Sequence, residues 1–292
     1  MGLGTWQWGD YFIWRYGKGY SDADLREAFH VSLKAGIHFF DTAEVYGRGR
    51  SERLLGQFLP EVGQPVVVAT KFMPLPWRLR KGALKAALRA SLKRLRLERV
   101  DLYQVHWPFR PRAVEVWAEG LADVVEAGLT RAVGVSNYSA DQMARAHEVL
   151  AKRGVPLSSN QVEYNLLNRS VERNGVLARC RELGVTLIAY SPLAKGLLTG
   201  KYTPENPPPG LRRRLFHPTS LAAMQPLIRL MRETGRPPSQ VSLNWLVSKG
   251  VIPIPGAKNA RQAADNAAAL DWRLTAEQAS ALDQWSIDPT GR

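Results

Sequence analysis

The feature that most constrains the fold is a repeated alternation between short apolar runs and longer amphipathic stretches. The apolar runs are rich in β-branched residues and are nearly continuous, as in Pro65–Thr70 and Val185–Ala189. Strands that are covered on both faces show this pattern, whereas a strand with one wet face alternates between apolar and polar residues. Helical patterns follow most of the runs, so the chain predicts βα units and a parallel sheet.

About eight strand–helix units are visible in the 292 residues. Strands are expected over residues 1–5, 37–40, 65–70, 100–105, 131–135, 157–162, 185–189 and 251–254. Helices are expected over residues 21–35, 51–58, 84–95, 113–127, 140–152, 170–183, 259–268 and 275–287, with two more on either side of residues 235–238. This count matches an α/β fold of the (β/α)8 TIM-barrel type. No change in composition marks a linker, so we expect a single domain over residues 1–292, with a long cofactor-side loop at residues 193–218.

Polar or ionisable side chains recur where the expected strands end. They are Asp41, Lys71, His106, Ser136, Asn137, Gln161 and Tyr190. Each one alone has an ordinary explanation, such as a loop cap, a solvated strand end or a buried core histidine. In a TIM barrel, however, all C-terminal strand ends meet at one face, and active sites are built there. The shared position of these residues therefore predicts an active site at that face.

Asp41, Tyr46, Lys71 and His106 together suit proton donation to a carbonyl oxygen. A phenol titrates near pH 10, and a nearby ammonium is expected to lower the pKa of Tyr46. A carboxylate would hold that lysine in place, and a neutral histidine would orient the carbonyl. A carbonyl carbon that is reduced must also receive a hydride, which no side chain supplies, so a nicotinamide or flavin is required.

Five segments of the chain carry a family resemblance: Gly36–Ala43, Tyr46-Gly47, Ser51–Gly56, Val68–Lys71 and Asp101–Pro108. Together they resemble the aldo-keto reductases, and the resemblance extends over essentially the whole chain. It implies that Asp41, Tyr46, Lys71 and His106 form a catalytic tetrad in which Tyr46 is the general acid in reduction. Several motif forms, Trp107-Pro108 among them, resemble the bacterial and plastid oxidoreductases close to the potassium-channel β-subunit branch.

The resemblance also implies NADPH as the cofactor of an enzyme that acts on CH-OH donors. Asn160 and Gln161, with Ser136 and Asn137, resemble the residues that hold the nicotinamide carboxamide, and Tyr190 resembles the aromatic residue that stacks on its ring. Lys258 and Arg261 stand at the start of a helix, where a phosphate is favoured, and their charge favours NADPH over NADH. The implied cofactor-binding residues are Thr5, Trp6, Ser136, Asn137, Gln161, Tyr190, Ser191, Pro192, Leu193, Gly196, Lys201, Gly256, Lys258, Arg261, Gln262, Asp265 and Asn266.

Trp6, Tyr46, His106 and Trp107 are expected to face the carbonyl substrate. Other aromatic residues in loops at this end either extend an aromatic wall or pack the loops, and they are Trp8, Tyr11, Trp14 and Trp77. The run Arg212–Arg214 is either a lid over the cofactor phosphates or an ordinary solvated charge run. The N-terminal hairpin that usually plugs the bottom of the family's barrel is not seen before the first expected strand.

The formal net charge of +14 raises the question of a nucleic-acid partner. The basic residues are dispersed over many segments, however, and no nucleic-acid motif accompanies them. One cysteine, Cys180, excludes a disulfide framework, and no signal peptide, membrane-length apolar run or metal-ligand spacing is visible. We expect a cytoplasmic monomer or weak homo-oligomer that binds a small-molecule carbonyl, and neither nucleic acid nor membranes.

Two other functions stay open at this point. A Schiff-base aldolase would use Lys71 and would need no nicotinamide. An NADPH-binding redox-sensing or regulatory subunit would keep the fold and show little turnover, although the intact tetrad favours a catalyst.

Overall fold

A computed structural model describes residues 1–78, 80, 82–109, 112–209 and 218–285. Its centre is one parallel sheet in which each strand pairs with the next strand along the chain, from β1 to β8. The strands are β1 (Leu3–Gly4), β2 (Phe39–Asp41), β3 (Val67–Phe72), β4 (Val100–Val105), β5 (Thr130–Ser136), β6 (Leu157–Glu163), β7 (Thr186–Tyr190) and β8 (Ile252–Pro253). The predicted order of the strands is therefore confirmed.

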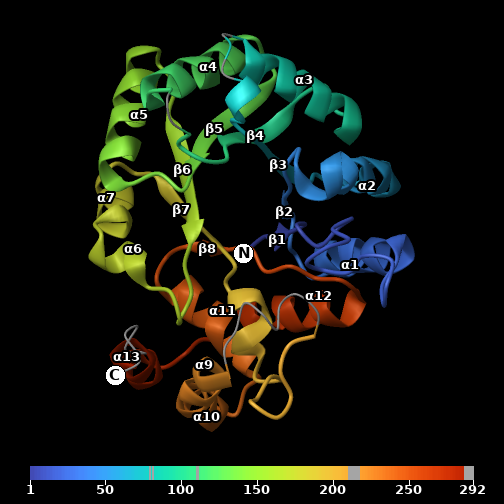
Figure 1. Cartoon of the computed structure of the whole chain (residues 1–292), viewed down its shortest axis with the longest axis vertical. Coiled ribbons are helices and arrows are strands. Elements are labelled where there is room, and N and C mark those ends of the chain that lie inside the picture. Colours follow the sequence, from blue (N-terminus) through green and yellow to red (C-terminus); the bar gives the residue numbers. More distant parts are fainter. Residues whose placement is uncertain (79, 81, 110–111, 210–217, 286–292) are drawn as a thin grey trace.

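The sheet curls into a barrel-like form, and the helices lie around its outside (Figure 1). Backbone hydrogen bonds also join its first and last strands. The Gly2 amide donates to the Pro253 carbonyl at 3.0 Å, and the Gly4 amide donates to the Pro255 carbonyl at 2.9 Å. Consecutive strands are parallel, so their C-terminal ends lie at the same edge of the sheet.

Local capping sets where several helices begin. Ser21, Ser139 and Thr275 each form a capping box with the residue three positions later, and the Asn259 side chain caps the helix that follows it. The α-helices are α1 (Asp22–Lys34), α2 (Arg50–Phe58), α3 (Ala83–Leu95), α4 (Val114–Glu126), α5 (Ala140–Lys152), α6 (Ser170–Arg173), α7 (Val176–Glu182), α9 (Pro218–Ala223), α10 (Gln225–Glu233), α11 (Pro238–Ser248), α12 (Ala260–Ala267) and α13 (Ala276–Gln284). The 3-10 helices are η1 (Tyr46–Gly49), η2 (Leu59–Glu61), η3 (Pro76–Arg78), η4 (Ala194–Thr199) and η5 (Ala268–Leu270).

One expectation about the helices is corrected by the structure. The single helix expected over residues 170–183 is two helices, α6 and α7, because Gly175 takes the left-handed conformation (φ 79°) and the Asn174 side chain caps the second helix. The long loop expected over residues 193–218 contains η4, and its residues 210–217 lie outside the described part of the chain.

Large apolar side chains fill the space between the sheet and the surrounding helices. Phe29, Phe40 and Phe58 are fully buried, and Phe29 of α1 contacts both Phe40 of β2 and Phe58 of α2. The Cys180 thiol is also buried, 3.6 Å from the Met143 sulfur, which fits the expected packing role. None of the helices in the described ranges is long and apolar enough to cross a membrane.

The contact between α2 and α3 depends on a glycine. A Cβ atom on Gly56 would lie 2.6 Å from the carbonyl carbon and oxygen of Leu95 and 2.7 Å from the carbonyl oxygen of Arg94. These are backbone atoms at the end of α3, so they cannot move aside as a side chain can. The missing side chain at residue 56 therefore lets the two helices approach closely.

We predict that Gly56→Ala lowers the free energy of unfolding by about 2 kcal/mol, because overpacking costs more than the ~1 kcal/mol that alanine gains in a helix. Urea unfolding would measure this. Gly63→Ala is the matched control, since no atom lies within 4 Å of the added Cβ. A loss of stability no larger than that of the control would contradict the close contact.

Candidate active site

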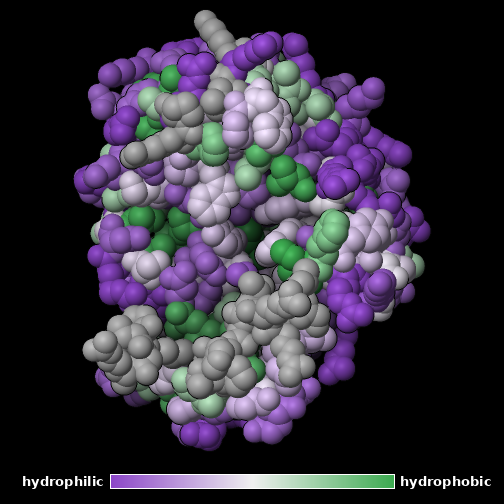
Figure 2. All heavy atoms as spheres, in the orientation of Figure 1, coloured by the Kyte–Doolittle hydropathy of each residue, from purple (hydrophilic) through white to green (hydrophobic). Residues whose placement is uncertain are grey.

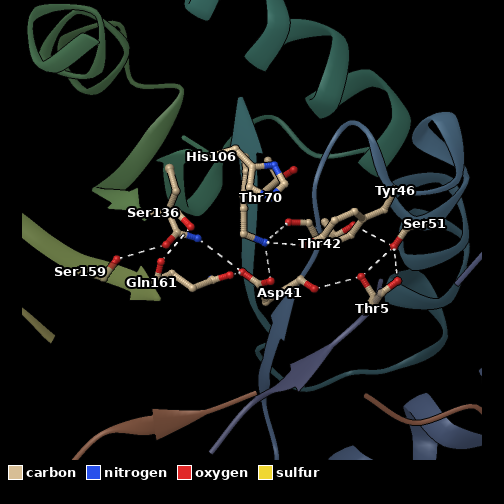
Figure 3. Close-up of polar contacts among 12 residues, drawn as sticks. Thr5, Asp41, Thr42, Tyr46, Ser51, Thr70, His106, Ser136, Ser159 and Gln161 are labelled. Carbon is tan, nitrogen blue, oxygen red and sulfur yellow. Dashed lines mark hydrogen bonds and ion pairs between the residues drawn. The ribbon is translucent and has the colours of Figure 1, made fainter. Parts of the chain in front are cut away.

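The sheet brings the predicted strand-end residues together at its C-terminal edge. Asp41 is the last residue of β2, Lys71 lies in β3, and His106 directly follows β4. Tyr46 opens η1, which continues into α2. Figure 3 shows the side chains of Asp41, Tyr46 and His106 around this point. The four residues assigned to the tetrad are thus neighbours, although 65 positions separate the first from the last in the sequence (106 − 41).

A buried ion pair forms the centre of the site. The Lys71 Nζ atom donates to Asp41 Oδ2 at 2.5 Å and to the Thr42 carbonyl at 2.8 Å, and Lys71 has no exposed surface. Burial disfavours the ammonium, but the charges of Asp41 and Tyr46 and their hydrogen bonds outweigh it and raise the pKa of Lys71. A Schiff-base lysine needs a neutral amine that reaches the substrate. The geometry therefore argues against an aldolase.

Three hydroxyl groups support the backbone beneath Asp41. The Thr5 amide and hydroxyl both donate to the Asp41 carbonyl, at 2.9 and 3.0 Å. The Ser51 hydroxyl lies 2.7 Å from that of Thr5 and 2.9 Å from that of Thr42 (Figure 3). These contacts join β1, β2 and α2, so they hold the backbone of Asp41 in place at the end of β2. The sequence predicted Thr5 as a cofactor contact and did not predict this supporting role.

Tyr46 approaches the ion pair through its hydroxyl group. Lys71 Nζ donates to Tyr46 Oη at 3.4 Å. Burial raises the pKa of Tyr46 above its usual value of 10, Lys71 opposes this shift, and Asp41 adds to it. We expected the net pKa to be lowered, and this expectation is wrong because burial outweighs the ammonium. The phenol is consequently protonated at neutral pH, with a cation beside its oxygen.

His106 is a neutral imidazole beside Tyr46. The two rings meet edge to face, with their centroids 5.9 Å apart. Burial, helped by the charge of Lys71, lowers the pKa of His106 to about 3. Its Nδ1 atom is buried and has no hydrogen-bond partner among the described residues, and its backbone carbonyl accepts from Asn137 Nδ2 at 3.0 Å. The neutral histidine that we expected is therefore present.

A cleft of about 1000 Å³ opens above these residues and continues across the C-terminal edge of the sheet. Figure 2 shows this face of the molecule hollowed near its centre, within a largely hydrophilic rim. Apart from Asn160, the residues predicted to bind the cofactor line the cleft: Thr5, Trp6, Ser136, Asn137, Gln161, Tyr190, Ser191, Pro192, Leu193, Gly196, Lys201, Gly256, Lys258, Arg261, Gln262, Asp265 and Asn266. Lys71 does not line it.

The side chain of Gln161 reaches the cleft, but that of its neighbour Asn160 does not. The side chain of Gln161 lines the cleft and donates to Asp41 Oδ1 at 2.8 Å, whereas Asn160 is fully buried and donates to the Tyr138 carbonyl. Successive side chains of a strand point to opposite faces, so only one of the two can reach the cleft. The role in binding the carboxamide that the resemblance implied for Asn160 is thereby corrected.

Asn137 connects the histidine to the far wall of the cleft. It directly follows β5 in a left-handed conformation, with φ 63°. Its Nδ2 atom donates to the His106 carbonyl, while its Oδ1 atom accepts from the Tyr190 hydroxyl at 3.0 Å. Ser136 Oγ donates to the Gln161 carbonyl at 2.8 Å. These bonds hold the polar wall of the cleft in a fixed arrangement.

The segment that follows β7 has an unusual backbone. Ser191, Ala194 and Lys195 all have positive φ angles, between 46° and 56°, and Gly196 follows with φ 98°. Non-glycine residues adopt this region at a cost and do so most often at functional sites. Arg212–Arg214, for which we considered a lid, lie outside the described residues.

Positive charge gathers at the other end of the cleft, where α12 begins. The Lys258 ammonium donates to the Trp14 carbonyl at 3.1 Å and lies over the rings of Trp14 and Tyr20, at 5.0 and 4.7 Å. Arg261, in the first turn of α12, has a side chain that is 91% exposed. The contact of Lys258 with the loop after β1 was not predicted, because no local pattern links residues so distant in sequence.

The aromatic residues separate into two groups. Trp6, Trp14 and Trp107 line the cleft, and Trp6 and Trp14 meet edge to face at 5.5 Å. Trp8 is fully buried and donates to the Ala257 carbonyl, so it packs the loop. Tyr11 and Trp77 are exposed and do not line the cleft. These aromatic residues thus divide into side chains that line the cleft and side chains that do not.

Comparison with known proteins gives one consistent family. The profile of the aldo/keto reductase family matches residues 1–287. The chain is 43% identical to the chloroplastic pyridoxal reductase of Arabidopsis thaliana, over 97% of this chain and 82% of that protein. It is 31% identical to the aldo-keto reductase YhdN of Bacillus subtilis, over 100% of this chain and 92% of that protein.

Solved structures agree with the sequence matches. The glycerol dehydrogenase of Gluconobacter oxydans superposes with a TM-score of 0.83 at 31% identity, covering 99% of this chain and 93% of that one. An aldo/keto reductase of Klebsiella pneumoniae, solved in complex with NADP and acetate, gives a TM-score of 0.77 at 27% identity, covering 97% of this chain and 89% of that one.

The pKa of His106 predicts how stability depends on pH. The unfolded chain takes up a proton at this histidine below about pH 6.5, whereas the folded protein does not do so until about pH 3. The stability that the neutral imidazole confers is therefore complete above pH 6.5 and is lost as the pH falls toward 3. Between pH 7 and pH 5, the wild type should lose about 2 kcal/mol more than His106→Gln. Urea unfolding at both pH values measures this, and equal losses in the two proteins would contradict a buried neutral histidine.

Proposed function

The chain belongs to the aldo/keto reductase family, and from this premise we propose that it is an NADPH-dependent oxidoreductase that reduces aldehydes or ketones to alcohols. The observation that carries the proposal is the contact between Tyr46 and the buried Lys71–Asp41 pair, beside neutral His106 and at the floor of the cleft. We take the curled sheet to be a closed (β/α)8 barrel in a single domain. The hydrogen bonds of Gly2 and Gly4 to the last strand support this description.

Tyr46 is the proposed general acid. Its phenol is protonated at neutral pH, since burial raises its pKa. When the proton passes to a carbonyl oxygen, the negative charge that develops on Tyr46 Oη lies 3.4 Å from the Lys71 ammonium. A preorganised cation at that position stabilises the transition state more than the ground state. Asp41 fixes the ammonium there through its Oδ2 atom.

His106 is the proposed orienting group. A neutral imidazole that is buried next to Tyr46 can donate a hydrogen bond to the same carbonyl oxygen that receives the proton. An imidazolium at this place would be repelled by Lys71, and the low pKa of His106 excludes it. The carbonyl oxygen would thus be held between a phenol and a ring N–H.

The residues along the cleft suit a nicotinamide dinucleotide. Ser136, Asn137 and Gln161 would hold the carboxamide, Tyr190 would stack on the ring, and the cations at α12 would contact the adenosine phosphate. When bound, the nicotinamide supplies the hydride for the carbonyl carbon. Support comes from the Klebsiella pneumoniae relative, whose structure holds NADP.

Planar aromatic aldehydes are the proposed substrate class. Trp6 and Trp107 line the cleft near Tyr46, together with Val45, and give its outer part flat apolar walls. The Arabidopsis thaliana relative is named for reducing pyridoxal, which is an aromatic aldehyde. Pyridoxal and simple benzaldehydes are consequently the first compounds to test as substrates, with NADPH oxidation as the readout.

The role of Tyr46 is tested with Tyr46→Phe. We predict that kcat falls at least about 100-fold, because the proton donor is lost, while the Kd for NADPH changes less than about twofold. Tyr138→Phe is the matched control. Tyr138 is also buried, but in the part of the chain that the structure describes its hydroxyl has no hydrogen-bond partner and does not line the cleft.

Two outcomes would count against this proposal. A parallel loss of NADPH affinity in Tyr46→Phe would mean that the residue serves binding instead of proton transfer. A wild-type protein that binds NADPH but oxidises none of it in a single turnover with any carbonyl of the panel would favour the regulatory subunit.

Cofactor preference is tested with Lys258→Ala. The variant should weaken NADPH binding about tenfold and NADH binding much less, because only NADPH carries the additional phosphate. Arg89→Ala removes an equal charge from the exposed side of α3 and should change neither affinity. Fluorescence titration of the wild type and of both variants measures the Kd for NADPH and the Kd for NADH. If NADPH and NADH weaken alike, Lys258 acts by holding Trp14 and Tyr20, and the phosphate assignment is wrong.

A further inference from the structure

A second glutamine reaches Asp41 from inside the barrel. Gln104 lies in β4 and has no exposed surface. Its Nε2 atom donates to Asp41 Oδ1 at 3.4 Å, and its Oε1 atom accepts from Ser159 Oγ at 3.4 Å. The hydrogen-bonded chain of the site therefore continues from Lys71 through Asp41 and Gln104 to Ser159 in β6.

The register of the strands builds this chain into the barrel. Lys71 is the partner of Gln104, Gln104 of Gly134, and Gly134 of Ser159, on four consecutive strands. A Cβ atom on Gly134 would lie 2.2 Å from Ser159 Oγ and 3.1 Å from Gln104 Cγ. The space that the glycine leaves is thus filled by the two polar side chains, and it lets them meet between β4 and β6.

Asp41 determines which way the Gln104 amide faces, and Ser159 bonds the other end of that amide. A carboxylate only accepts hydrogen bonds, so the amide presents its NH₂ group to Asp41 Oδ1. A flipped amide would place an oxygen next to Asp41 Oδ1, where two acceptors repel each other. The Ser159 hydroxyl then donates to Oε1, so that neither end of the buried amide is left without a partner.

Gln104 differs from the other glutamine on Asp41 in its access to ligands. Gln161 donates to the same Oδ1 atom but also lines the cleft, where a bound molecule can compete for its amide. Gln104 does not line the cleft, so no molecule in the cleft can draw its amide away. Asp41 Oδ1 consequently keeps one donor whatever Gln161 binds.

We propose that Gln104 is a positioning residue of the active site, which keeps the Asp41 carboxylate turned toward Lys71 and so keeps the ammonium at Tyr46. Asp41 Oδ2 holds Lys71, and rotation of the carboxylate would give up the Oδ1 bond to Gln104. Because the amide is neutral, it restrains the carboxylate without introducing a second cation, which would compete with Lys71 for Oδ2. The catalytic part of this inference rests on the proposed function, whereas the coupling between Gln104 and Asp41 does not.

A double-mutant cycle tests that coupling without cofactor or substrate. Gln104→Met removes the amide at nearly constant volume, and Asp41→Asn removes the charge that it serves. We expect Gln104→Met to lower the thermal unfolding midpoint about 2 °C more in the wild type than in Asp41→Asn. Equal shifts in the two backgrounds would show that Gln104 only fills space, and they would overturn the proposal.

Activity supplies the second readout. In Gln104→Met, kcat should fall about tenfold, as for the loss of one hydrogen bond to a charged group, while the Kd for NADPH stays within about twofold. The alkaline limb of the profile of kcat against pH should move to higher pH. Without the Gln104 hydrogen bond, the negative charge of Asp41 is less neutralised and raises the pKa of Tyr46 further. The other ionisable neighbours of Tyr46, namely Lys71, His106 and Tyr190, are unchanged in the variant.

Ser159→Ala repeats both measurements with a smaller change, since it keeps Gln104 and removes only the hydrogen bond to its amide oxygen. It should show the same directions with smaller effects, and it decides the matter if Gln104→Met does not fold. Unchanged kcat and an unchanged pH profile in the folded variants would overturn the positioning role. A wild type without turnover would refute the proposed function alone, because the unfolding cycle still reports on Gln104.

Discussion

The ion pair between Lys71 and Asp41 is the interaction on which the rest of the site depends. Two charges without contact to water are stable only if their remaining donors and acceptors are also bonded. The Thr42 carbonyl meets that requirement for the ammonium, and two glutamine amides meet it for the carboxylate. The pair in turn supplies the one positive charge that faces Tyr46 Oη among the contacts described for it. Polar groups on β2 to β6 are therefore committed to a single arrangement.

Burial has opposite effects on the two neutral members of the site. It keeps Tyr46 protonated by raising its pKa, and it keeps His106 unprotonated by lowering its pKa. Both residues thereby present an uncharged hydrogen-bond donor at neutral pH. The same dry environment strengthens the effect of Lys71 on any charge that develops at Tyr46 Oη. A carbonyl reductase needs this combination of a neutral donor before the reaction and a nearby cation during it.

The cleft extends this polar centre toward α12 through segments that are far apart in the chain. Trp14 and Tyr20 from the loop after β1 contact Lys258 after β8, and Trp14 also contacts Trp6 near Tyr46. The loop after β1 thus contributes both to the proposed substrate wall and to the end with the basic residues. A change at Lys258 can consequently affect more than one part of the cleft, which is why NADH serves as the comparison ligand.

The sequence alone determined the order of strands and helices, because apolar periodicity and helix caps are local properties. It also determined which residue types stand at the strand ends, and hence the candidate tetrad. It could not decide which neighbouring residue faces the cleft, as Asn160 and Gln161 show, because that depends on strand register. Nor could it decide the net pKa shift of Tyr46 or the contact of Gln104 with Asp41. Those properties depend on distances and burial that exist only after β2 to β6 are paired, so the tertiary structure alone set them.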